Sequence, residues 1–565
     1  MPLATHPARR IPAVLSALLL LAATAGAQTT VSVEADDPVL ARIDRLVSEG
    51  AIRTAIVGQR PYSRREVVRL LTEARATADS LADIAPARAA RIYALLALDS
   101  ARFASPGGMG TRLVDRVSGE AVAGGGDART IPFGAPGQGA MGRIDAITNP
   151  LVERRLGRIY DRRYTLALET SHRLQLGRHA ALAVSPRAWT GSNGDQPACA
   201  VVPCPLEADL DRERPMNGVM LRTAALTVGG GNVRLIIGRD HLLLGQSMFG
   251  GGLMISDNAP ALDMIRVASD APFRLPWIFH HLGPLQGTAY LADLGGGPDV
   301  DHPKLAGWKV SFLPSPRVEW GVSVQSEQGG DGAPGASVAQ RIADLLPLID
   351  VLALQDRDLM FSNKLAGVDV LVRIPELRGL ELYWDGVIDD FDIRRIRSSL
   401  TEDGAHVVGA AVTRLTGTSD YRLDVEARYT GLRFYQHEQF PEGLTTDRFI
   451  IGDPIGPRAR GLALRLTRDP GGRSPLMLTW ALERRSDDQY VIDAEEVTAE
   501  GWTFRKVEDR PEEIRNRIML TWLPVLPARS LTGRLDLGWE HVRNWAFSAR
   551  THDAALLRIG LDARF

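Results

Sequence analysis

The last eleven residues, Ala555 to Phe565, read Ala-Leu-Leu-Arg-Ile-Gly-Leu-Asp-Ala-Arg-Phe. Successive side chains of a β-strand point to opposite faces, so one face of this stretch is apolar and the other is mostly polar. The apolar face consists of Leu557, Ile559, Leu561, Ala563 and Phe565. Two structures fit this pattern: an edge strand of a soluble sheet, or a strand with lipid on one side and a polar lumen on the other.

The amino-terminal end predicts export. Arg9 and Arg10 precede an apolar run from Ile11 to Ala25, and Ala25-Gly26-Ala27 offers a small-residue cleavage site. A charged segment, a short apolar segment and small residues are typical of a secretory signal peptide, which we place at residues 1–27. The run of about 15 residues is shorter than the ~20 that a membrane-spanning helix needs, although an uncleaved anchor is the alternative.

Charge and cysteine usage narrow the class of protein. The net charge of −2 becomes more negative once Arg9 and Arg10 are removed, so nothing indicates a nucleic-acid partner. The two cysteines, Cys199 and Cys204, are close in sequence, and in an oxidising compartment we expect them to form a disulfide. Their segment offers too few further ligands for a metal ion, and we expect neither a metal nor a cofactor.

Residues 28–104 carry the signals of a small helical domain. Asp36-Asp37-Pro38 is a favourable helix start, and Ser63 with Glu66 makes a capping box for a second helix. These helices are amphipathic, so their apolar stripes must pack together or against something larger. The next stretch, 105–140, is rich in Gly and Pro, and we interpret it as a linker.

From residue 141 to residue 565 the dominant pattern is strand. Apolar and polar residues alternate in segments of about 8–12 residues, the length that a tilted strand needs to cross a bilayer. Pairs of segments flank tight turns, as at Pro314-Ser315-Pro316 and Asp469-Pro470-Gly471-Gly472. Long polar loops separate other pairs, roughly at 192–217, 327–341, 436–460 and 484–512. Alternation alone fits a soluble sandwich too, but long strands with unequal connections favour a transmembrane barrel.

The most distinctive motif lies in the first half of this strand-rich region. Gly238-Arg239-Asp240 is followed by Gly250-Gly251-Gly252 and then by Ser256-Asp257-Asn258-Ala259-Pro260. This arrangement resembles the motif of the Wzi-type capsule assembly family, in which a Gly-Arg strand precedes a turn and a Leu-Ile-Ser-Asn-Asn-Ala-Pro segment. The sequence departs from the family at Leu244-Gly245-Gln246, where a Trp and a Pro are missing, and at Asp257, which replaces the first Asn.

The resemblance implies a fold and a role. It implies a mainly β protein: a large antiparallel transmembrane β-barrel of about 18 strands in the outer membrane, with a periplasmic helical domain at one end. It also implies a lectin-like role in attaching capsular polysaccharide to the cell surface. The residues that would contact the polysaccharide are Arg239, Ser256, Asp257 and Asn258. A purely structural alternative is that Asp257 and Asn258 cap a tight turn and that the glycines allow backbones to approach.

No group of residues predicts catalysis. Asp389 and Asp390 are adjacent, as are His280 and His281, and neighbours on a strand point to opposite faces. We therefore predict a non-enzymatic outer-membrane protein, with a porin or solute channel as the alternative function. The expected partners are outer-membrane lipid, exported polysaccharide and the outer-membrane assembly machinery. The apolar face of the last strand would be the signal that this machinery recognises, and it comprises Leu557, Ile559, Leu561, Ala563 and Phe565.

Overall fold

The computed structural model describes most of the chain after residue 27. It covers residues 28–565 except 104–109, 125–150, 152–155, 159, 161–162, 193–216, 251, 297–299, 347–360, 390–395, 418–419, 438, 441–442, 448, 487–489, 499–500, 507–509 and 527–530. The predicted signal peptide and both cysteines lie outside the described residues, so the cleavage and the disulfide stay predictions. No helix in the described part combines the length and apolar character needed to span a membrane.

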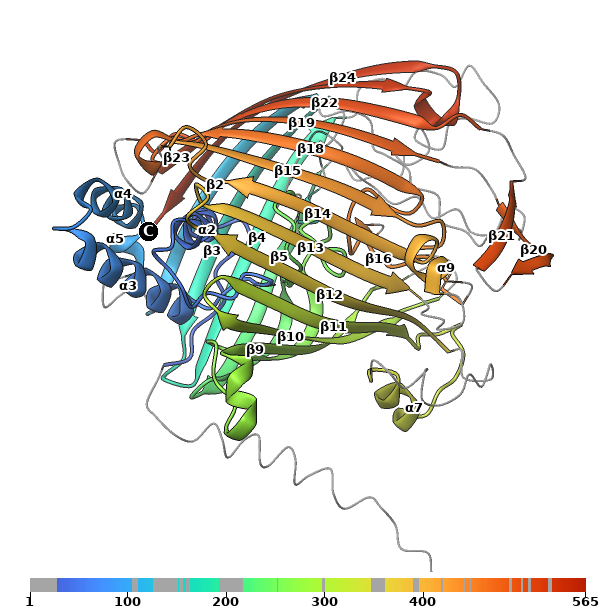
Figure 1. The fold of residues 1–565 in the computed structure, drawn as a ribbon, viewed down its shortest axis with the longest axis horizontal. Helices are drawn as coiled ribbons and strands as arrows, with labels where there is room; N and C mark the ends of the chain where they lie inside the picture. The colour runs from blue at the N-terminus through green and yellow to red at the C-terminus, as the bar shows by residue number, and fades with distance from the viewer. Residues whose placement is uncertain are drawn as a thin grey trace, which may run out of the picture.

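A closed antiparallel barrel of 18 strands forms the body of the described structure (Figure 1). Each wall strand pairs with its two neighbours, and the last strand, β24, pairs with β23 on one side and with the first wall strand, β2, on the other. The wall strands are β2 (Arg112–Gly124), β3 (Tyr164–Gln175), β4 (Ala180–Ser192), β5 (Asn217–Gly230), β6 (Val233–Asp240), β8 (Leu262–Ser269), β9 (Leu285–Asp293), β10 (Lys304–Ser315), β11 (Val318–Gln328), β12 (Ser362–Ile374), β13 (Leu380–Asp389), β14 (Gly404–Val412), β15 (Tyr421–Thr430), β18 (Ala459–Arg468), β19 (Leu476–Arg485), β22 (Glu513–Trp522), β23 (Leu531–Arg543) and β24 (Thr551–Arg564). The predicted barrel and its strand number are confirmed.

The carboxy-terminal strand β24 has the two faces that its sequence predicts. Leu557, Ile559 and Leu561 are 40–53% exposed on the outer face, whereas Leu556 and Arg558 are buried on the lumen side. An outer face of bare apolar side chains is favourable only against lipid, and a barrel satisfies every backbone hydrogen bond within the wall. The stretch is therefore the closing strand of a membrane barrel and not the edge of a soluble sheet.

Strand β2 corrects the predicted domain boundary. Its residues Arg112–Gly124 lie within the stretch 105–140 that the sequence suggests is a linker, yet they form the wall strand that meets β24. The outward positions of β2 are Val117, Gly119, Ala121 and Ala123. These small side chains give little apolar periodicity, and Gly-rich sequence follows them, so local pattern alone does not distinguish this strand from a linker.

The amino-terminal helices lie at the end of the barrel where the chain terminates (Figure 1). They are α2 (Pro38–Ser48), α3 (Arg64–Leu81), α4 (Pro86–Ala97) and α5 (Ser100–Phe103). The predicted helix starts are confirmed: the Asp37 carboxylate accepts a hydrogen bond from the Val39 amide, and the Ser63 hydroxyl accepts one from the Glu66 amide. Apolar residues of α2, α3 and α4 pack into one buried cluster.

The connections at the two ends of the barrel differ in length. Short turns join strands at the end that carries the helices, as at η5 (Pro470–Gly472) between β18 and β19. Long connections lie at the other end, and they include α7 (Val338–Ala343), α9 (Ile396–Thr401) and the hairpin of β20 (Tyr490–Thr498) and β21 (Gly501–Lys506). Outer-membrane barrels place short turns in the periplasm and long loops outside the cell, so the helices lie on the periplasmic side.

Candidate functional site: loops folded into the lumen

The first of two loops that fold into the barrel connects β7 (Leu243–Leu244) to β8. A Cβ atom on Gly252 would lie 1.7 Å from the carbonyl oxygen of Leu244, so only glycine lets the chain double back this tightly. The chain then carries Leu253, Met254 and Ile255 into the lumen, where they are at most 3% exposed. The Gly-rich motif of the sequence is therefore the bend that directs this loop inward.

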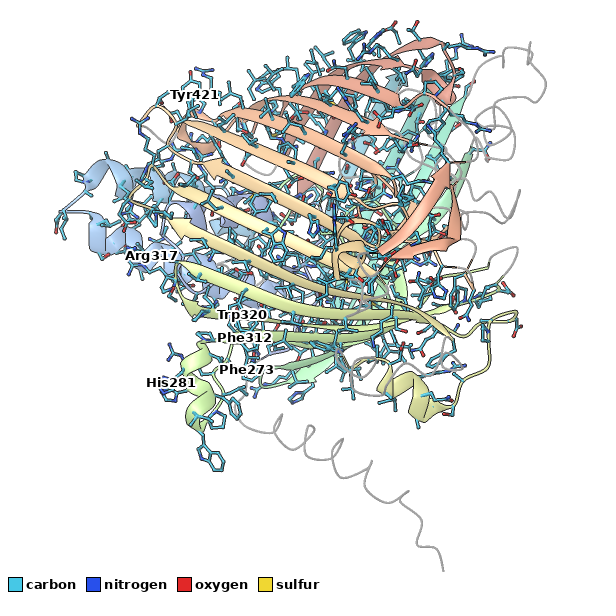
Figure 2. The ribbon with its side chains drawn as sticks, turned by 45° about the vertical axis from the view of Figure 1, so that its right-hand side comes forward. Phe273, His281, Phe312, Arg317, Trp320 and Tyr421 are labelled. Carbon is cyan, nitrogen blue, oxygen red and sulfur yellow. The ribbon has the colours of Figure 1, made fainter. Side chains whose placement is uncertain are left out.

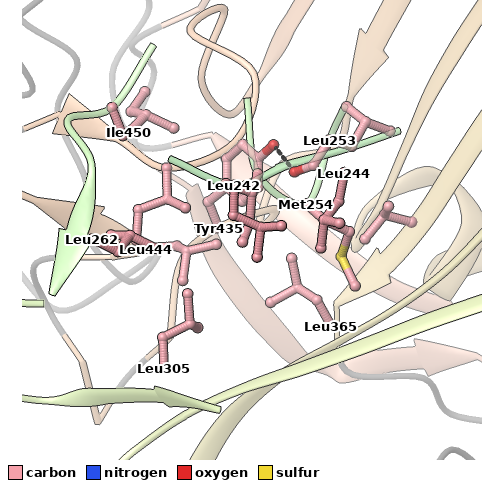
Figure 3. Close-up of a cluster of buried hydrophobic side chains, with 14 of the residues drawn as sticks. Leu242, Leu244, Leu253, Met254, Leu262, Leu305, Leu365, Tyr435, Leu444 and Ile450 are labelled. Carbon is pink, nitrogen blue, oxygen red and sulfur yellow. Dashed lines mark hydrogen bonds between the residues drawn. The ribbon is translucent and has the colours of Figure 1, made fainter. Parts of the chain in front are cut away.

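The second loop, residues 431–458, connects β15 to β18 and includes β16 (Thr445–Thr446) and β17 (Phe449–Ile450). Its Tyr435 hydroxyl donates a hydrogen bond to the Leu253 carbonyl oxygen over 2.5 Å and accepts one from the Asp453 amide over 2.8 Å. The bond to Leu253 thus joins the two loops inside the barrel (Figure 3). The sequence predicts a long polar loop at 436–460. The structure corrects this prediction, because the described part of the segment folds into the barrel and is partly apolar.

Both loops pack against the inner face of the wall in one apolar cluster, which we call the lumen core (Figure 3). It consists of Leu242, Leu244, Leu253, Met254, Ile255, Ala259, Leu262, Met264, Tyr290, Ala292, Leu294, Leu305, Leu365, Leu371, Tyr383, Val387, Ala405, Val407, Phe434, Tyr435, Leu444, Phe449, Ile450 and Ile451. All of these residues are buried, although a water-filled barrel would have a polar lumen. The barrel therefore has a packed interior at this level.

Three of the predicted polysaccharide-binding residues, Ser256, Asp257 and Asn258, lie inside this packed region and are 2–8% exposed. The Ser256 hydroxyl donates to the Gly452 carbonyl oxygen over 2.5 Å, and the Asn258 side-chain amide donates to the Ile450 carbonyl oxygen over 2.8 Å. These bonds tie the first loop to the second. They are structural bonds between loops and not the turn caps that the structural alternative supposed, and contact with a sugar stays a prediction.

The backbone of the same motif holds a third inward segment. The amides of Leu156 and Gly157 donate to the carbonyl oxygens of Asp257 and Asn258 over 2.7 and 3.1 Å. The side chain of the next residue, Arg158, then lies within 3.3 Å of the Glu169 carboxylate on β3. The Ser-Asp-Asn motif thus connects three separate parts of the chain inside the barrel.

Arg239, the fourth predicted residue, lies elsewhere. It shares the outer face of β6 with Ile237 and pairs with Asp263 on β8, whose side chain is 54% exposed. The Arg239 Nε atom donates to Asp263 Oδ1 over 2.9 Å. The structure therefore brings Ser256, Asp257 and Asn258 together but places Arg239 on the opposite side of the wall.

Charged side chains that face the lumen form ion pairs across strands and segments. Glu169 on β3 contacts Arg116, Arg158 and Arg222, and its carboxylate lies 2.9 Å from Arg116. On the other side of the barrel Lys309 pairs with Asp369, and both are at most 1% exposed. Buried charges are stable only when they are paired, so these contacts are part of a closed interior.

Three described carboxylates of the lumen are bonded within the protein. Asp369 is bound to Lys309 and to the Gln246 side chain, and Asp385 accepts a hydrogen bond from the Leu253 amide. Asp389, one of the adjacent pair in the sequence, is buried and accepts from the Tyr435 amide, while Asp390 lies outside the described residues. Within the part of the chain that the structure describes, no cluster of His, Cys, Asp and Glu could hold a metal ion.

The amino-terminal segment and helices close the periplasmic end by bonding directly to the wall. The Glu319 carboxylate on β11 accepts hydrogen bonds from the amides of Val57 and Gly58 over 3.0 and 2.8 Å. Ser48 at the end of α2 donates to Glu381 on β13 over 2.8 Å. These bonds hold the end of α2 and the segment after it against the inner wall, while α3, α4 and α5 lie beyond the end of the barrel (Figure 1). We call residues 28–103 the plug.

The plug also reaches the seam where the barrel closes. The Asp37 carboxylate lies 2.8 Å from Arg564 on β24 and 2.7 Å from Arg102 on α5. Burial raises the pKa of Asp37, but the guanidinium groups of Arg102 and Arg564 outweigh it and hold that pKa well below its ordinary value. Asp37 is thus a helix cap and a charged contact to the closing strand at once.

Comparisons with known proteins give one family and a set of structural neighbours. The sequence model of a family described as capsule assembly protein Wzi matches residues 135–551. Among solved structures, Wzi from Escherichia coli, described as an outer membrane protein involved in group 1 capsule assembly and a carbohydrate-binding β-barrel, superposes with a TM-score of 0.61 at 15% identity, covering 96% of this chain and 100% of that chain.

Two further neighbours are more distant. OccAB2 from Acinetobacter baumannii gives a TM-score of 0.41 at 10% identity, covering 80% of this chain and 97% of that chain. OprD from Pseudomonas aeruginosa gives 0.38 at 10% identity, covering 80% and 94%. No curated protein sequence matches the chain.

Proposed function

Because the chain belongs to the Wzi capsule assembly family and forms an outer-membrane β-barrel, we propose that it binds an exported capsular or extracellular polysaccharide and holds it at the cell surface. The observation that carries this proposal is the packed interior: among the described residues the plug is bonded to the inner wall at the periplasmic end, and the two inward loops form the lumen core. We therefore infer that a sugar chain does not pass through the barrel. Binding would therefore take place on the extracellular end.

The same observation argues against the alternative function, a porin or solute channel. A channel needs a continuous water-filled lumen lined by polar side chains. Here the described residues put a buried apolar cluster against the inner face of β8 to β14, with buried ion pairs beside it and on β3 and β5. We propose no catalytic step, since the described lumen carboxylates Asp369 and Asp385 are enclosed and bonded within the protein.

We propose a modified role for the motif residues. For a polysaccharide to reach Ser256, Asp257 or Asn258, the loop 431–458 would have to leave the lumen, because Ser256 and Asn258 are bonded to its backbone. These residues would then support binding indirectly, by fixing the loops that form the floor of the extracellular surface. Arg239 stands apart on the outer face and would act only where a glycan approaches from the membrane side.

Insertion of the barrel by the outer-membrane assembly machinery is part of the same proposal. The machinery would read the outer face of β24, where Leu557, Ile559 and Leu561 are exposed together with Phe565. Ala563 completes the same face.

The decisive experiment deletes the gene in its own host. The proposal expects cell-bound polysaccharide to fall and polysaccharide in the medium to rise, while total synthesis and the entry of small solutes stay unchanged. The purified protein should bind the isolated polysaccharide and give no steady conductance in planar bilayers. Unchanged glycan retention together with slower solute entry would overturn this proposal in favour of a channel.

A further inference from the structure

The connection between β8 and β9 carries an exposed apolar segment that the proposed function does not use. It forms the short helix η2 (Trp277–Leu282), in which no residue is buried. Trp277, Ile278 and Phe279 are 86, 74 and 50% exposed. Three large apolar side chains in succession are unusual on a surface that meets only water.

This segment projects sideways from the periplasmic rim of the barrel. Figure 2 shows His281 and Phe273 on a segment outside the wall, at the end of the barrel that carries the helices. The segment is tied to the rim at both ends: Phe273 and Leu285 exchange backbone hydrogen bonds, and the Leu313 amide donates to the Pro284 carbonyl oxygen over 2.8 Å. It is therefore held in a fixed position beside the wall.

The neighbouring outer wall is aromatic. Phe312 on β10 and Trp320 on β11 stack with ring centroids 4.4 Å apart, and both lie on the outward face near the same rim (Figure 2). Aromatic rings of outer-membrane barrels gather where the acyl chains meet the headgroups. The stacked pair thus marks the inner boundary of the bilayer close to the base of η2.

The composition of the segment suits that boundary. Trp and Phe combine an apolar body with a preference for the membrane interface, and the exposed Arg274, His280 and His281 beside them can face phosphate groups. A helix that lies in the interface plane buries its apolar side chains at the headgroup–acyl boundary.

We propose that η2 is a membrane anchor that seats Trp277, Ile278 and Phe279 in the phospholipid leaflet on the periplasmic side. The occupant is lipid because the segment continues the lipid-facing wall sideways, in the plane of the bilayer, and not along the barrel axis toward the periplasm (Figure 1). The anchor would fix the depth and tilt of the barrel at its plugged end.

The test measures lipid contact directly. The full chain and the Trp277→Phe variant are reconstituted in phosphatidylcholine vesicles, and the difference between their emissions reports Trp277. In vesicles whose lipids carry bromine near the headgroup, this difference should lose intensity, and bromine at the bilayer centre should quench it much less. Equal emission in brominated and unbrominated vesicles would overturn the proposal.

A second variant guards against a fold defect. Ile278→Asp with Phe279→Asp should abolish the quenching of Trp277 while leaving a folded barrel. The matched control is Val338→Asp with Ile342→Asp on α7, where the side chains are 73 and 59% exposed at the opposite end, and it should leave the quenching unchanged. If Trp277 stays shielded from water without any bromine quenching, a second copy of the chain covers it and the lipid proposal is wrong.

Discussion

Removing the Glu319 carboxylate should loosen the plug at one definable point. This side chain is fully buried, and it accepts hydrogen bonds from the Val57 and Gly58 amides, from the Gln246 side chain and from Arg373. Glu319→Ala deletes the common acceptor of all four donors. Among the described residues, the Arg373 guanidinium, itself buried, would then keep a longer contact of 3.9 Å to Glu381.

The expected cost follows from the kind of contact that is lost. Removing one partner of a buried charged pair costs about 3–5 kcal/mol, but Arg373 belongs to the wall, so this loss destabilises the barrel and does not change the opening of the Val57–Gly58 segment. Each of the two amides left without an acceptor costs about 1–3 kcal/mol, although these terms do not simply add. For the local opening we therefore take about 3 kcal/mol in Glu319→Ala, which raises the open population of the segment by roughly a hundredfold. Glu319→Gln keeps one carbonyl acceptor, and about 2 kcal/mol is expected.

Hydrogen exchange measures this local opening. In reconstituted protein the peptide that contains Val57 and Gly58 should exchange much faster in Glu319→Ala and somewhat faster in Glu319→Gln. The matched control is Glu376→Ala, because Glu376 also lies at the periplasmic end but forms an exposed pair with Arg317. Such surface pairs contribute about 0–1 kcal/mol, so exchange should hardly change. Equal exchange in all three variants would refute the role given to Glu319.

Three further predictions test other parts of the structure. Asn258→Ala should remove the side-chain donor to the Ile450 carbonyl oxygen and cost about 1–3 kcal/mol, measured as faster hydrogen exchange around β17. The control Asn516→Ala, on the exposed outer face, should leave that exchange unchanged. Faster exchange in the control than in Asn258→Ala would contradict the link between the loops. Asp37→Asn should lower the thermal stability, and the loss should be largest at neutral pH, where the Asp37 carboxylate of the wild type is ionised. The gap to the wild type should shrink as the pH falls below about 4, because a carboxylate whose folded pKa is depressed loses its contribution on protonation; a gap independent of pH would rule this out. Finally, Cys199 and Cys204 should resist alkylation until a reductant is added, and labelling without reductant would disprove the disulfide.

Local sequence pattern predicts the wall and the helix starts well. The alternation at Leu557, Ile559 and Leu561 is enough to predict a strand with a lipid-facing side, because successive residues of such a strand face lipid and lumen in turn. The caps at Asp37 and Ser63 are equally local. The resemblance around Ser256–Pro260 then selects a barrel among the all-β folds.

The interior is not predictable in this way. Phe449, Ile450 and Ile451 follow no period, and only the empty space of a closed barrel makes their burial favourable. For the same reason the motif residues Ser256 and Asn258 fit a binding site in sequence, whereas the structure uses them to join two loops. Arg239 is close to these residues in sequence, but its side chain lies on the outer face of the wall. Which face it occupies depends on the strand register.

The ion pairs of the lumen have a consequence for how such a chain can diverge. The carboxylates of Glu319, Glu169 and Asp369 each form ion pairs with Arg or Lys side chains on other strands. A substitution at one of these positions is therefore tolerated only when its partner also changes. Positions on the outer face need no specific partner, because any apolar side chain is compatible with lipid. Related sequences should therefore drift freely outside and covary in pairs inside. Divergence of this kind would preserve a barrel while leaving 15% identity between this chain and a structure that superposes over nearly all of it.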